Sequence, residues 1–107
     1  MPLASLTPEE REVVRRAMAA TFEFFDWDFQ TRLGVYPDTM RQLLSGWPDV
    51  DDAYDSDAYL AINNAMNDLL HGVGISDAKA TEITGADRAE MRRIYLKWAG
   101  DRGTGLL

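Results

Sequence analysis

The sequence predicts an all-α fold, a compact bundle of five or six helices forming a single domain over residues 1–107. Apolar residues recur at intervals of three and four, which is the spacing of one face of a helix. Sustained alternation with a period of two is absent, and no hairpin dipeptide lies between apolar runs, so we expect no strands. With 46% hydrophobic side chains, the 107 residues can bury one core without covalent staples.

The first expected helix has a strong start signal. Thr7 can cap it, Pro8 suits the first helical position, and Glu10 completes a capping box. The face that follows is apolar and comprises Val13, Val14, Ala17, Met18, Thr21, Phe24 and Phe25. Asp28 would interrupt this face. We therefore expect a break at residues 26–28 and then a short helix to Leu33, or alternatively one unbroken helix.

Aromatic residues are dense around the expected break. Phe24 and Phe25 fall on the apolar face, whereas Phe22 and Trp27 fall at its edges. One of these two edge residues is expected to be exposed or to take part in a subunit interface, with core filling as the alternative.

Gly, Pro and capping residues delimit the later helices. We expect one helix from Pro37 to near Gly46, one from Ser56 or Asp57 through His71, a short one from Ser76 to Thr84, and a last one that begins at Asp87. Residues 100–107 are expected to form a flexible tail.

The net charge of −7 is concentrated in one connection, which we call the acidic loop (residues 49–57). It contains Asp49, Asp51, Asp52, Asp55 and Asp57 and no cation, and without it the net charge would be −2. A field of this sign repels phosphate backbones and favours a basic protein partner. Counted from Asp49, the sixth and twelfth positions lack the Gly and Glu of a calcium-binding EF-hand loop. We expect a solvated loop, with a contact for a basic partner as the functional alternative.

Two segments 51 positions apart share a pattern in which a helix ends at a Gly and a second helix follows. Gly34, Met40, Arg41 and Trp47 align with Gly85, Met91, Arg92 and Trp98. The first segment resembles the helix-turn-helix of repressor-type DNA-binding regulators, over about twenty residues. This resemblance implies that the second helix of a pair would contact the major groove.

The second segment is the more basic of the two. Arg88, Arg92, Arg93 and Lys97 all lie in its second helix. They are the candidate nucleic-acid contacts if either segment binds DNA. The alternative is that both segments are ordinary helical hairpins with similar caps and core positions.

The helix before His71 carries an unusual polar stripe. Asn63, Asn64, Asn67 and His71 cluster on one side, and Leu60 lies among them. A leucine ringed by amides suggests a covered surface, so we expect either the N-terminal helix or a second subunit to cover this stripe. The alternative is a polar, solvated face.

Catalytic signatures are missing from the sequence. His71 is the only histidine and there are no cysteines, which fits a reducing cytoplasm. Neither a phosphate-binding glycine loop, a metal-binding motif nor a membrane-spanning run of apolar residues occurs. We therefore expect a cytoplasmic, non-enzymatic protein-interaction or regulatory module without a cofactor.

The expected partner is a protein, which can be basic or a second copy of the chain. Its candidate contacts are Asp49, Asp51, Asp52, Asp55, Leu60, Asn64, Asn67 and His71. A small helix-turn-helix DNA-binding regulator is the alternative function.

Overall fold

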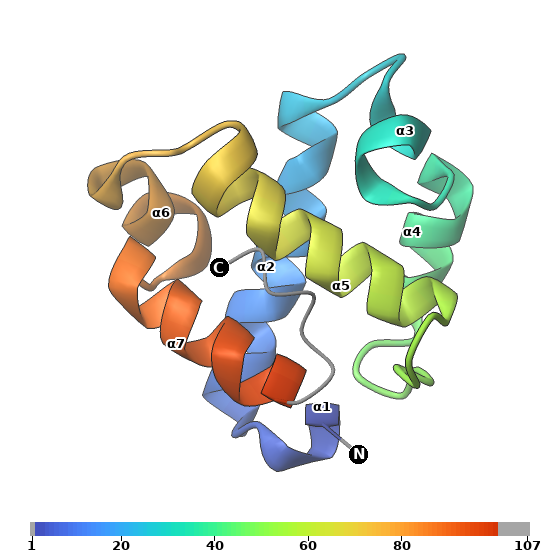
Figure 1. The fold of residues 1–107 in the computed structure, drawn as a ribbon, viewed down its shortest axis with the longest axis horizontal. Coiled ribbons are helices and arrows are strands. Elements are labelled where there is room, and N and C mark those ends of the chain that lie inside the picture. The colour runs from blue at the N-terminus through green and yellow to red at the C-terminus, as the bar shows by residue number, and fades with distance from the viewer. Residues whose placement is uncertain (1, 101–107) are drawn as a thin grey trace.

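The computed structural model describes residues 2–100, and within this range the chain forms helices and no strands (Figure 1). The elements are α1 (Pro2–Ser5), α2 (Pro8–Phe24), α3 (Phe29–Leu33), α4 (Pro37–Ser45), α5 (Asp57–Asn67), η1 (Asp68–Gly72), α6 (Asp77–Thr84) and α7 (Arg88–Ala99). The all-α prediction is confirmed. Each expected helix is present, and α1 is an additional short one. Most of the expected tail lies outside the described residues.

The longest helix, α2, and the central helix, α5, cross each other and form the middle of the molecule (Figure 1). On one side of this crossing lie α3 and α4, and on the other lie α6 and α7. The core contains fully buried side chains from both sides, including Leu33, Met40, Met66, Met91 and Ile94. None of the helices in the described range is long and apolar enough to cross a membrane.

Helix α2 begins and ends as its sequence predicts. Thr7 Oγ1 accepts from the backbone N–H of Glu10 at 3.1 Å, and Glu10 Oε1 accepts from the backbone N–H of Thr7 at 2.8 Å. The helix ends at Phe24, and the chain breaks before α3 begins at Phe29. The break avoids burying the carboxylate of Asp28 in the apolar face.

Two helical hairpins, α3–α4 and α6–α7, have closely matching turns. Gly34 and Gly85 both adopt the left-handed conformation, with φ of 77° and 82°, and close the preceding helix. Each is followed by a buried apolar residue and then by the N-cap of the next helix. The aligned residues Met40 and Met91 are both fully buried. The repeated sequence pattern therefore corresponds to a repeated backbone turn.

Helix α5 continues into the wider π-helical turn η1, so the segment stays helical through His71 as expected. The backbone N–H of Val73 donates to the carbonyl of Asp68 at 2.6 Å, five residues earlier. Single π-helical turns are rare in proteins, and those that occur are often found at functional sites. This turn forms one wall of the pocket described next.

Candidate functional site

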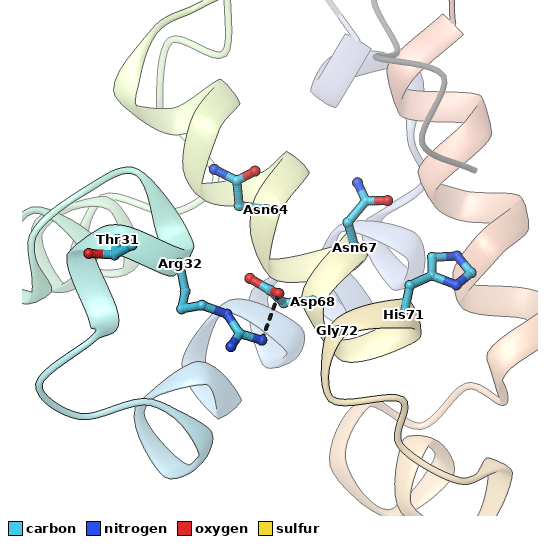
Figure 2. Close-up of a pocket in the computed structure, with 7 residues that line it drawn as sticks. All are labelled: Thr31, Arg32, Asn64, Asn67, Asp68, His71 and Gly72. Carbon is cyan, nitrogen blue, oxygen red and sulfur yellow. Dashed lines mark hydrogen bonds and ion pairs between the residues drawn. The ribbon is translucent and has the colours of Figure 1, made fainter.

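A polar pocket of about 440 Å³ lies between α3 and the end of α5 with η1 (Figure 2). It gathers three residues of the predicted polar stripe, Asn64, Asn67 and His71. The sequence did not indicate its other lining residues, which are Thr31, Arg32, Asp68 and Gly72. Leu60 lies further along α5, where it is partly buried against the core and does not line the pocket.

An ion pair between Arg32 and Asp68 connects the two walls of this pocket. Arg32 Nη2 lies 3.1 Å from Asp68 Oδ1, and the Asp68 side chain is only 17% exposed (Figure 2). The guanidinium also lies 4.6 Å from the centroid of the Phe25 ring, within the range of a cation–π interaction. These contacts fix α3 relative to η1. Since the paired residues are 36 positions apart, no local sequence pattern could have revealed them.

Because Gly72 has no side chain, it leaves room for this ion pair. A Cβ atom at this position would lie 2.4 Å from Asp68 Oδ1 and 3.0 Å from Arg32 Nη2. Any side chain here would displace the pair. The glycine therefore has a role in the pocket in addition to ending the helix.

Neighbouring parts of the same chain cover the stripe of asparagines. Asn64 Nδ2 donates to the carbonyl of Leu33 at 2.9 Å and so caps the end of α3. Asn63 is buried, and its Oδ1 accepts from the Tyr95 hydroxyl at 2.6 Å. Helices α3 and α7 thus contribute to this cover.

Asn67 is 8% exposed and has one unused polar atom. Its Nδ2 donates to the carbonyl of Asn63 at 2.8 Å, which orients the amide. Its Oδ1 has no hydrogen-bond partner among the described residues. A buried acceptor without a partner costs about 1–3 kcal/mol. The fold therefore buries one acceptor of Asn67 that the other described residues do not satisfy.

His71 is exposed at the rim of the pocket, and a smaller depression of about 180 Å³ lies on its other side. Figure 2 shows Asn67 and His71 on the side of α5 that faces α7, and Arg32 on the opposite side. Neither ring nitrogen of His71 has a hydrogen bond to another described side chain. The imidazole is thus available at the surface as a donor or an acceptor.

The acidic loop is not uniformly solvated, and the expectation that Asp52 contributes to a solvated partner contact is wrong. Asp49, Asp51 and Asp55 are exposed, but Asp52 is fully buried. Asp52 Oδ2 accepts from the backbone N–H of Leu3 and from the Trp98 indole. An aspartate run does not indicate which of its members turns inward, because that depends on donors supplied by distant segments.

The cations Arg88, Arg93 and Lys97 of α7 bind other parts of the chain. Arg88 donates to the carbonyls of Leu70 and Ile75, at 2.7 and 2.6 Å. Arg93 and Lys97 both bind Glu10 on α2, at 2.7 and 2.8 Å, and Arg93 also pairs with Glu90. Arg92, which also lies in α7, is exposed.

The pKa of the Glu10 carboxylate, which binds both Arg93 and Lys97, is strongly lowered by these cations. The hydrogen bond from Lys97, then that from the Thr7 backbone and that from Arg93, lower the pKa of Glu10 to about 2. The bond from Arg93 likewise lowers the pKa of Glu90. Carboxylates on α2 and α7 therefore neutralise much of the basic charge on α7.

The described residues hold no group of three or more His, Cys, Asp or Glu side chains that could bind a metal ion. In comparisons with known proteins, no family model, no curated protein and no solved structure matches the chain.

Proposed function

We propose that this protein is a non-enzymatic protein-interaction module that holds a short polar segment of a partner protein in the α3–α5–η1 pocket. The observation that carries this proposal is the pocket itself, which brings together the amides of Asn64 and Asn67, the imidazole of His71 and the charge-compensated pair of Arg32 and Asp68. A partner that binds only the folded chain would stabilise it by mass action.

The chemistry of the pocket favours a peptide over a strongly charged ligand. The charges of Arg32 and Asp68 compensate each other, so the pocket offers donors and acceptors without excess charge. A peptide group carries one donor and one acceptor, which the exposed hydroxyl of Thr31 and the exposed imidazole of His71 can match. A volume of about 440 Å³ falls within the range of sites that enclose small ligands or a few residues.

The exposed part of the acidic loop supports a second contact. Asp49, Asp51 and Asp55 project from the connection between α4 and α5. They add a negative field that steers a basic partner and raises its association rate. We propose that these three residues steer the partner toward the protein and that contacts in the pocket provide the affinity for it.

The contacts of the α7 cations disfavour the DNA-binding alternative. A cation that is already paired with Glu10 or bound to backbone carbonyls must lose those contacts before it can bind phosphate. It also releases fewer counterions, which is the main source of affinity for DNA.

The surroundings of His71 support a non-enzymatic role. A catalytic base is held by a third group and lies within reach of a nucleophile. His71 is exposed, and none of the described side chains orients it through a hydrogen bond. Its position at the rim suits a contact with a partner.

Site-specific photo-crosslinking tests the proposal. A photoreactive residue at Thr31, which lines the pocket, should crosslink a partner in cells. The same residue at Gln42, which is exposed on α4 and outside the pocket, is the matched control. The affinity of the identified partner is then measured calorimetrically for the native chain and for the His71→Ala and Gln42→Ala variants.

We expect crosslinking at position 31 only, and a loss of about fivefold in affinity for His71→Ala, the value of one hydrogen bond of about 1 kcal/mol. Gln42→Ala should bind like the native chain. Equal crosslinking at both positions, or equal affinity of all three proteins, would refute the proposed site.

A further inference from the structure

Trp27 is the most exposed large hydrophobic residue in the described part of the chain, at 92% exposure. It lies in the connection between α2 and α3, which extends outward at the edge of the molecule (Figure 1). Exposed tryptophans are uncommon on a soluble surface, and tryptophan is enriched among the residues that dominate protein interfaces. The polar pocket does not include this residue.

The backbone on both sides of Trp27 is held in place. Phe25 and Phe29, two residues before and two after it, are 6% and 2% exposed. The N–H of Phe29 donates to the carbonyl of Asp26 at 3.0 Å, and the N–H of Asp26 donates to Asp28 Oδ1 at 3.3 Å. Since its neighbours are anchored in the core, the indole is presented outward by an ordered turn. Such preorganisation lowers the entropic cost of binding.

The charge around the indole is negative. Glu23 and Asp26 are exposed, and Asp28 is half-buried. Arg32 and Arg41 lie over the rings of Phe25 and Phe22, close in sequence to Trp27, but each is paired with a carboxylate, that of Asp68 and that of Asp38. An electron-rich ring flanked by carboxylates attracts a cation by two mechanisms, cation–π attraction and ion pairing.

We propose that Trp27, with Asp26 and Asp28, is an anchor for an arginine or lysine side chain of a basic protein segment. The partner's cation stacks on the face of the indole, and its N–H groups donate to the two carboxylates. This surface is separate from the pocket of the proposed function and does not depend on it.

Charge also argues against two other occupants. A symmetric contact with a second copy would bring the same carboxylates of both chains together, which is repulsive. An anionic membrane surface would be repelled for the same reason, although exposed tryptophans often lie at membrane interfaces.

The test uses a labelled, amidated peptide of alternating arginine and glycine as the probe, with binding followed by fluorescence anisotropy. Trp27→Ala removes the ring, Trp27→Leu keeps an apolar side chain but removes the cation–π partner, and Asp26→Asn with Asp28→Asn removes both charges while keeping an acceptor for the turn. Tyr36→Ala is the matched control, because Tyr36 is another exposed aromatic residue, at 66% exposure.

We expect both Trp27 variants and the double Asn variant to bind the probe about tenfold more weakly than the native chain. Tyr36→Ala and His71→Ala should bind it like the native chain, which separates this anchor from the pocket. The proposal is overturned if Trp27→Ala binds the probe like the native chain, because the acidity of the protein as a whole would then explain binding. It is also overturned if Trp27→Leu binds the probe like the native chain, because an apolar contact would then be enough. It is also overturned if the native chain dimerises through Trp27, or binds neutral phosphatidylcholine vesicles through it, without binding the probe.

Discussion

The indole Nε1 of Trp98 donates a hydrogen bond of 2.8 Å to Asp52 Oδ2, although the two residues are 46 positions apart. The same oxygen accepts from the backbone N–H of Leu3 at 3.1 Å. One buried carboxylate thus connects α1, the acidic loop and α7. The Tyr59 ring, with its centroid 5.4 Å from that of Trp98, adds α5 to this cluster.

The first prediction concerns this carboxylate. Asp52→Ala leaves the Trp98 indole and the Leu3 N–H without their acceptor in a buried position, so we expect the free energy of unfolding to fall by about 2–4 kcal/mol. Urea denaturation followed by circular dichroism measures this change. Asp51→Ala, an exposed neighbour, is the control and should cost under about 1 kcal/mol. Equal stability of the two variants would contradict the structural role of Asp52.

The second prediction concerns Gly72. Gly72→Ala places a Cβ in contact with Asp68 Oδ1, so we expect a loss of about 1–3 kcal/mol in unfolding free energy. In an Asp68→Ala background the obstructing atom is absent, and the cost of the same substitution should shrink below about 1 kcal/mol. A double-mutant cycle by urea denaturation measures this coupling. If the cost is the same in both backgrounds, the steric account is wrong.

The third prediction concerns pH. The pKa of Glu10 is about 2 in the folded protein and 4.5 as the ordinary value, so the unfolded chain binds the proton more readily. The stabilisation is therefore fully present above about pH 5 and is lost as the pH falls toward about 2. We estimate this contribution at about 1–2 kcal/mol, because water screens the half-exposed cations around Glu10.

Glu10→Gln should remove this contribution, so its stability should fall less steeply between about pH 6 and pH 3 than that of the native chain. Denaturation at a series of pH values measures both slopes. Glu9→Gln, at an exposed position on the same helix, is the control and should retain the native slope. Parallel curves for the native chain and Glu10→Gln would show that Glu10 does not stabilise the fold through its charge.

The fourth prediction concerns nucleic acid. Because Arg93 and Lys97 are paired with Glu10, we expect no measurable affinity for labelled duplex DNA even at low salt, as judged by fluorescence anisotropy. For a DNA-binding protein, the logarithm of the association constant would instead fall linearly with the logarithm of the salt concentration. The slope would be about −0.9 per neutralised phosphate. If the chain binds DNA with this salt dependence, and if Arg92→Ala weakens that binding, the helix-turn-helix alternative would be restored.

The sequence could predict features that depend on neighbouring residues. The sequence predicts the capping box of Thr7 and Glu10 and the ends of the helices at Gly34 and Gly85, because each involves contacts within one helical turn. The break before Asp28 was also readable, since a carboxylate cannot lie within an apolar face. Three of the seven residues that line the pocket followed from the same logic, because Asn64, Asn67 and His71 share one face of a helix.

By itself, then, the sequence determined the helices, their limits and the concentration of acidic residues, because these follow from local spacing and composition. Only the tertiary structure decided which charges remain available. It buried Asp52 under Trp98, paired Arg93 and Lys97 with Glu10, and placed Arg32 against Asp68. The physical reason is that the environment of a charge depends on its neighbours in space, and here those neighbours come from segments tens of residues away.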